Sequence, residues 1–273
     1  MKIIATGLSY NEADVIADCV TSALTWCDEF VLYDSSTDNT AELAEEAGAI
    51  VIGGNPHEHF SEQLRQHTLN VADELCADWI VRIDPDEFYP IGASIGKDAP
   101  IVPRDVIEIA AQQHVQSLRA HVIQFWITLD DVRRGLLLEN EKTPVDLRRR
   151  WYSFGYSAVV AWQHQKGLRY ATSGVANTPV FVENGVNIGS MAGSPRLIQT
   201  HYPCRSWPQL WQRALHRRQY KKAFGKYLHN LVIDEQVAGL THWNGGPFSP
   251  VNNHAFLYKW YEKADELFKL RGI

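Results

Sequence analysis

Short apolar runs alternate with amphipathic segments through the first third of the chain. Runs typical of buried strands occupy residues 2–9, 29–33, 49–52 and 79–83. The segments between them repeat apolar residues with the spacing of one helical face, over residues 11–24, 40–47 and 61–76. A helix between every two strands predicts a parallel sheet with right-handed crossovers, and therefore the α/β fold class.

The second half of the chain has a less regular pattern. Pro103 predicts the start of a helix that continues over residues 105–113, and residues 120–128 have the composition of a strand. Amphipathic spacing predicts two further helices, over residues 206–224 and 253–270. Because no internal repeat or low-complexity linker interrupts the sequence, we expect a single domain over residues 1–273.

The bulk composition excludes several classes of protein. The chain has 273 residues and a net charge of −6 without a long basic run, which argues against nucleic acid as its main partner. Its four cysteines form no C-x-x-C pair, so neither a zinc framework nor a disulfide scaffold is predicted. The apolar run at Met1–Ala5 is too short for a signal peptide, and no stretch approaches the ~20 apolar residues of a transmembrane segment. We therefore expect a cytoplasmic protein.

Two carboxylates directly follow the fourth apolar run. The sequence Asp84-Pro85-Asp86-Glu87-Phe88 begins where the strand over 79–83 is expected to end. Ligands of open α/β sheets bind at that edge, outside the carboxyl ends of the strands. Carboxylate oxygens suit Mg²⁺ or Mn²⁺, and such ions are commonly shared with substrate phosphates. The pattern predicts a metal–diphosphate site, and the alternative is an acidic turn whose geometry Pro85 sets.

Polar residues also follow the first two predicted strands, at Ser9–Glu12 and at Asp34–Asp38. In a doubly wound sheet these strand ends converge with Asp84 on one edge. Three strings in this order resemble family 2-type glycosyltransferases of the GT-A fold: Asn11-Glu12-Ala13-Asp14, Ser36-Thr37-Asp38-Asn39-Thr40 and Arg82-Ile83-Asp84-Pro85-Asp86-Glu87-Phe88.

The resemblance implies a GT-A-like, Rossmann-like and mostly parallel sheet flanked by helices. Residues 1–90 would form a nucleotide-binding half, and residues 91–273 would form an acceptor-binding half with the C-terminal helices. It further implies a transferase that moves a sugar from a nucleotide-sugar donor to a hydroxyl of a glycan or a lipid-linked acceptor. With a lipid-linked acceptor, peripheral contact with a membrane stays open.

The resemblance also implies roles for single residues. Asp84 and Asp86 would hold Mn²⁺ or Mg²⁺ against the donor diphosphate, with Asp84 also in contact with the donor. The residues that would hold the nucleoside are Ser9, Asn11, Glu12 and Asp34. Ser35 stands where the family usually has glycine, which weakens the assignment of Asp34. Arg65 matches an arginine of the third helix that points at the nucleotide, and the alternative is a solvated helix charge.

A later segment, Thr200-His201-Tyr202-Pro203-Cys204-Arg205-Ser206, resembles a His-Tyr-x-x-Arg-Ser motif found in some of these enzymes. The motif implies that His201 is a third metal ligand and that Arg205 contacts the substrate. A neutral imidazole can complete such a site. We expect this segment to begin a helix, and the alternative for His201 is a structural role at the helix start.

An inverting transferase needs a general base that accepts the proton of the acceptor hydroxyl. Asp130 and Asp131, just after the predicted strand over 120–128, are the best placed, and Asp146 and Glu87 are further candidates. Retention of configuration is left open. Two other functions are also considered: a sugar-nucleotide nucleotidyltransferase, although the expected Gly-rich signature is absent at residues 6–10, and a non-catalytic carbohydrate-binding protein of the same fold.

Overall fold

The computed structural model describes residues 1–54, 64–126, 151–170, 179–181, 187–203, 205, 239–242, 248 and 253–254. The chain falls into two compact units. The first combines Met1–Ile123 with Phe154–His201, and the second combines Gln124–Ser153 with Tyr202–Ile273. The single domain expected from the sequence stays a prediction.

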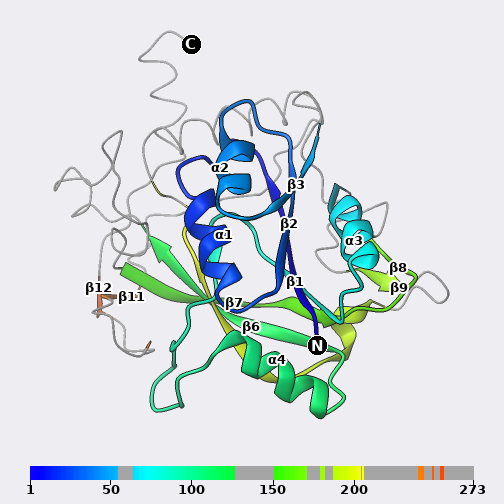
Figure 1. Cartoon of the computed structure of the whole chain (residues 1–273). Helices are drawn as coiled ribbons and strands as arrows, with labels where there is room; N and C mark the ends of the chain where they lie inside the picture. Colours follow the sequence, from blue (N-terminus) through cyan, green and yellow to red (C-terminus); the bar gives the residue numbers. More distant parts are fainter. Residues whose placement is uncertain are drawn as a thin grey trace, which may run out of the picture. The chain divides into compact units, whose positions relative to one another are not determined.

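The first unit begins with alternating strands and helices (Figure 1). β1 pairs in parallel with both β2 and β4, and β2 pairs in parallel with β3. These elements are β1 (Ile3–Ser9), α1 (Ile16–Leu24), β2 (Glu29–Asp34), α2 (Thr40–Glu46), β3 (Ile50–Gly53), α3 (Arg65–Glu74) and β4 (Trp79–Arg82). The predicted α/β fold class with a parallel sheet is confirmed.

Later strands extend this sheet in antiparallel fashion. β4 pairs with β7, and β5 pairs with β10, both antiparallel, so the complete order is β3-β2-β1-β4-β7-β6-β10-β5. The added elements are β5 (Glu87–Phe88), α4 (Pro103–Gln112), β6 (Ser117–Trp126), β7 (Trp151–Gln163) and β10 (Ala192–His201). β8 (Leu168–Arg169) pairs with β9 (Val180–Phe181) outside this sheet, and the short helix η2 (Ile188–Met191) precedes β10.

Apolar side chains pack on both faces of the parallel strands. Every residue of β1 is buried, as expected for a strand covered on both sides. One cluster contains Ile16 and Val20 of α1 together with Ile107 of α4. A second contains Leu69 of α3 and Trp162 of β7. The core therefore fixes the carboxyl ends of β1, β2 and β4 at one edge.

A glycine allows two of these strands to approach closely. A Cβ atom at Gly7 would lie 2.6 Å from the carbonyl oxygen of Ile83, which is closer than real Cβ contacts come. The amide of Ile83 also donates to the carbonyl of Thr6 at 2.9 Å. Gly7 on β1 therefore lets the chain leave β4 close to β1, directly before Asp84.

Two predicted helix starts in the first unit were wrong. The first helix begins at Ile16 and not near residue 11, because Asn11 has a left-handed φ of 56° and Val15, with φ −143° and ψ −17°, is outside the helical region. The segment at Thr200–His201 does not begin a helix, because it ends strand β10 and pairs with Glu87 and Phe88. The predicted helix over 206–224 lies outside the described residues.

The described part of the second unit contains a small sheet and an aromatic cluster. β11 (Gly239–His242) pairs with residues 151–152 of β7 and with β12 (Asn253–His254). Residues 253–254 are thus strand, where the sequence predicted the start of a helix. The rings of Phe125 and Tyr202 stack with centroids 4.6 Å apart, and Tyr152 and Phe248 pack edge to face.

Candidate functional site

The ends of β1 and β2 are joined by hydrogen bonds to a buried carboxylate. Asp34 closes β2, and its Oδ1 accepts from the hydroxyls of Ser9 at 2.5 Å and Ser36 at 2.6 Å. Its Oδ2 accepts from the amide of Ser36 at 3.1 Å. Ser9 and Asp34 are both buried. The predicted pair therefore meets at one edge, with Asp34 bonded to the protein itself.

The two loops that follow these strands are also joined. The amide of Asn11 donates to the Ser36 hydroxyl at 2.7 Å, and the Asn11 side-chain oxygen accepts from the amide of Thr37 at 2.8 Å. The amide of Glu12 donates to the Thr40 hydroxyl at 2.9 Å. Two of the strings that suggested the family, at 11–14 and at 36–40, are therefore in contact.

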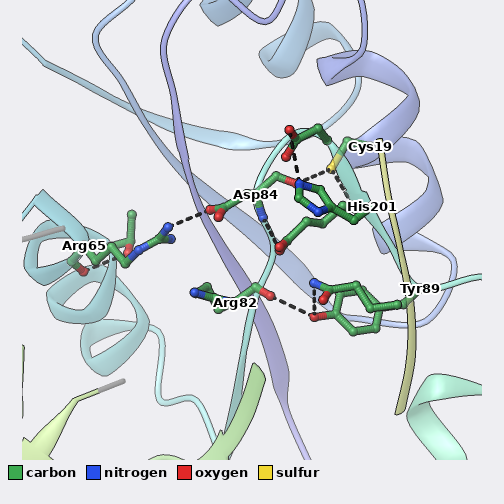
Figure 2. A network of polar contacts seen from close by, with 10 residues as sticks. Cys19, Arg65, Arg82, Asp84, Tyr89 and His201 are labelled. Carbon is green, nitrogen blue, oxygen red and sulfur yellow. Dashed lines mark hydrogen bonds and ion pairs between the residues drawn. The ribbon is translucent and has the colours of Figure 1, made fainter. Parts of the chain in front are cut away.

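Arg65 lies beside the first carboxylate of the turn after β4. It is the first residue of α3, and its side chain is 2% exposed. Its terminal nitrogen lies 2.7 Å from Oδ1 of Asp84, whose side chain points toward it in Figure 2. The alternative of a solvated helix charge is therefore wrong. The arginine contacts Asp84 at the edge of the sheet, and its predicted contact with the nucleotide stays a prediction.

Charges around the turn shift the pKa values of its residues. Burial opposes ionisation of Asp84, but Arg65 and Arg82 outweigh it and hold the pKa of Asp84 below its usual range. Burial, with the Asp84 charge adding to it, raises the pKa of Glu87 to about 7. Glu87 also accepts from the Asp84 amide at 3.1 Å, which ties the two ends of the turn together.

The second carboxylate of the turn meets the predicted histidine. Nε2 of His201 lies 3.6 Å from Oδ2 of Asp86, although the two residues are far apart in sequence. Antiparallel pairing of β10 with β5 sets His201 opposite Glu87 and so beside Asp86. Asp86 is 4% exposed, so it is a buried carboxylate and not a surface one.

Asp86 and His201 could supply two of the ligands of a divalent cation. A carboxylate and an imidazole are ligands that Mn²⁺ accepts, and phosphate oxygens and water commonly fill the remaining positions. Within the described residues, no group of three or more His, Cys, Asp or Glu side chains is arranged as a metal site. Asp84 is bound to Arg65. Asp86 and His201 are therefore the residues that could hold the ion, and the predicted role of Asp84 as a ligand stays a prediction.

Buried polar side chains beneath the turn form a group that the sequence did not predict. The Arg82 side chain is 3% exposed, and Glu87 and Asp84 raise its pKa against the effect of burial, so it stays charged. The hydroxyl of Tyr89 donates to the Arg82 carbonyl at 3.1 Å and accepts from Gln199 of β10 at 3.0 Å (Figure 2). Arg82 lies in the run over 79–83 that predicted a buried strand, but the sequence did not indicate which carboxylates would surround its charge.

Asp130, Asp131 and Arg205 are the other predicted site residues. Asp130 and Asp131, the expected general bases, lie outside the described residues. Arg205 belongs to the second unit, where it is fully buried and donates to the Tyr202 carbonyl at 3.3 Å. Its predicted contact with the substrate is untested.

No protein-family model matches the chain, and no curated protein matches it either. Solved structures do show similarity. Mannosyl-3-phosphoglycerate synthase from Rubrobacter xylanophilus is 13% identical, with 86% of this chain and 79% of that one covered and a TM-score of 0.43. Glucosyl-3-phosphoglycerate synthase from Mycobacterium tuberculosis, in complex with phosphoglyceric acid, is 18% identical, with 93% and 89% covered and a TM-score of 0.41.

TarS from S. aureus is 17% identical over 48% of this chain, with a TM-score of 0.30, and the match spans only 22% of TarS. Since all these TM-scores lie below 0.5, the case for a function depends on the residues of the site. In the part of the chain that the structure describes, no helix has the length and apolar character needed to cross a membrane.

Proposed function

We propose that this protein is a metal-dependent glycosyltransferase of the GT-A type. It would transfer a sugar from a nucleotide-sugar donor to a hydroxyl group of a glycan or a lipid-linked acceptor. The observation that carries the proposal is the meeting of Asp86 with His201 at the carboxyl end of β4, beside the ends of β1 and β2. That edge of an open α/β sheet is where such folds bind nucleotides.

The chemistry of transfer explains why charged groups gather there. Negative charge grows on the nucleoside diphosphate as the bond to the sugar breaks, and prearranged positive charge stabilises it. A divalent cation held by Asp86 and His201 would supply such charge at the diphosphate. Arg65 and Arg82 add two permanent positive charges to the same turn and are held rigidly, because both are buried.

Asp34 and its hydroxyl partners would give the nucleoside a rigid binding surface. Asn11 and Glu12 are only partly buried at this edge, so they can contact a ligand without a rearrangement of the core. Asp130 or Asp131 would act as general base in an inverting reaction. A cytoplasmic location is part of the proposal, and a lipid-linked acceptor would bring the protein to a membrane surface.

A panel of sugar nucleotides tests the proposal. The protein is incubated with UDP-, GDP-, CMP- and dTDP-sugars, with Mn²⁺, with Mg²⁺ or with EDTA, and release of the nucleotide is measured. We expect one nucleotide class to be consumed with metal and not with EDTA. The same class should raise the melting temperature, since a ligand at 100 times its Kd stabilises a protein by about 2.7 kcal/mol.

The Asp86→Asn variant is the control in this panel. Turnover that needs no metal, or that Asp86→Asn leaves unchanged, would contradict the proposal. Formation of a sugar nucleotide from a sugar phosphate and a nucleoside triphosphate would instead support the nucleotidyltransferase. Binding of carbohydrate without consumption of any sugar nucleotide would support the non-catalytic alternative.

A further inference from the structure

The two aspartates of the turn after β4 are held by different partners. Asp84 pairs with Arg65 at 2.7 Å, whereas Asp86 lies 3.6 Å from His201. The first partner comes from helix α3, and the second comes from strand β10. Although Asp84 and Asp86 are separated by a single residue, their carboxylates are fixed by unrelated parts of the fold.

Arg65 cannot easily release Asp84. The arginine side chain is 2% exposed, so a change in the direction of Asp84 would leave a buried guanidinium without its carboxylate. Removing one partner of a buried ion pair is strongly destabilising, because the remaining charge stays desolvated. Arg82 lies below the same turn and also favours the ionised form of Asp84.

We propose that Arg65 is a positioning residue that keeps Asp84 out of the coordination of the metal. This inference rests on the proposed function and deepens it. The ion is then held by Asp86 and His201, and Arg65 offsets the charge of Asp84. Because affinity for a divalent cation depends on the number and charge of its ligands, the nucleotide-free protein binds the ion weakly. The donor diphosphate supplies the missing negative charge, so ion and nucleotide enter the site together.

Binding of Mn²⁺ alone tests the inference without any assay of activity. The dissociation constant is measured by electron paramagnetic resonance of free Mn²⁺ in protein without nucleotide. Arg65→Met releases Asp84, and we expect the dissociation constant to fall about tenfold. Arg65→Lys keeps the positive charge and should stay close to wild type. Arg104→Met is the matched control, since Arg104 pairs with Asp28 at 2.8 Å at the opposite ends of the strands, and it should change nothing.

The double variant Arg65→Met with Asp84→Asn tests whether Asp84 coordinates the metal in the wild-type protein. It removes the ion pair as a unit, so the net charge near the ion is unchanged. We expect its dissociation constant to return to within about threefold of wild type. If Asp84 binds the metal in the wild-type protein, the double variant loses a ligand and binds Mn²⁺ more than tenfold more weakly, which overturns the inference.

Two further results separate this inference from the proposed function. If Asp86→Asn weakens Mn²⁺ binding while the double variant also weakens it, the metal site stands and the role of Arg65 is wrong. If Asp86→Asn has no effect on Mn²⁺ binding, the metal site and the inference both fail. Should Arg65→Met fail to fold, Arg65→Lys and the double variant still give these outcomes, with circular dichroism melts as the check on folding.

Discussion

The ends of β1 and β2 and the turn between β4 and β5 lie on one edge of the sheet, but they hold their carboxylates differently. Asp34 is bound by hydroxyl and amide groups of Ser9 and Ser36. Asp84 and Asp86 lie instead beside ionisable groups, Arg65 and His201. Neutral donors fix a carboxylate in place, whereas charged partners also set how strongly it attracts a cation.

The two regions of this edge therefore have different expected roles. The region around Asp34 is hydrogen-bonded within the protein itself, and in the proposed function it would shape the nucleoside surface. In the proposed reaction, the region around Asp84 and Asp86 would carry the charge that stabilises the leaving diphosphate. Substitutions around Asp34 should therefore lower stability more than metal binding, and substitutions of Asp86 or His201 should do the reverse.

Asp86→Asn should have the largest effect. We expect transfer to fall by about 10³-fold or more, because the variant would lose a proposed metal ligand beside the leaving group. The melting temperature of metal-free protein should not fall, since the Asp86 charge repels both Asp84 and Glu87. Turnover with Mn²⁺ and melting in EDTA measure the two effects. A large loss of stability with normal metal binding would place Asp86 in the scaffold instead.

His201→Ala should have the next largest effect. We expect the concentration of Mn²⁺ needed for half-maximal nucleotide binding to rise by about 10- to 100-fold, because a proposed ligand of the ion would be lost. Titrations of nucleotide binding at fixed Mn²⁺ concentrations measure this shift. His121→Ala, on β6, is the control and should leave the Mn²⁺ requirement unchanged. An unchanged requirement in His201→Ala would leave this residue with a structural role at the end of β10.

Asp34→Asn should lower stability and leave metal binding nearly unchanged, in contrast to Asp86→Asn and His201→Ala. The amide can no longer accept all three hydrogen bonds from Ser9 and Ser36, so we expect a loss of about 2 kcal/mol in the free energy of unfolding. Binding of Mn²⁺ alone should stay within twofold of wild type. Denaturant titration and Mn²⁺ binding test both statements. A variant of normal stability that loses nucleotide binding would make Asp34 a direct ligand of the nucleoside.

The smallest effect is expected at a hydrogen-bonded pair away from this edge. Nε2 of His164 lies 3.0 Å from Oδ1 of Asp73 on α3, and its hydrogen bond lowers the pKa of Asp73 from 3.8. A lowered carboxylate pKa stabilises the protein above pH 3.8, and this stabilisation is lost as the pH falls through the lowered value. His164→Gln should therefore melt slightly below wild type at pH 7 and converge with it in acid. A difference that persists undiminished below the lowered pKa of Asp73 would contradict this assignment.

The sequence by itself determined the parallel part of the fold. Its alternation of strand and helix patterns is local, and buried parallel strands need continuous apolar runs such as residues 79–83. The same pattern placed Ser9, Asp34 and Asp84 at one edge, because parallel strands end together. The residues around His201 identified it as a candidate site residue, but they did not predict that it ends a strand.

Tertiary structure alone decided how the carboxylates are paired. The packing of α3 against the sheet brings Arg65 to Asp84. Periodicity in the sequence does not predict which group the side chain of a helical arginine will contact. Asp86 meets His201 because β10 pairs with β5, a contact between distant segments. The burial of Arg82, Glu87 and Tyr89 also follows from the antiparallel strands added to the sheet. Burial and the direction of a side chain depend on the whole surrounding fold, whereas strand order within β-α-β units follows from local pattern and chirality.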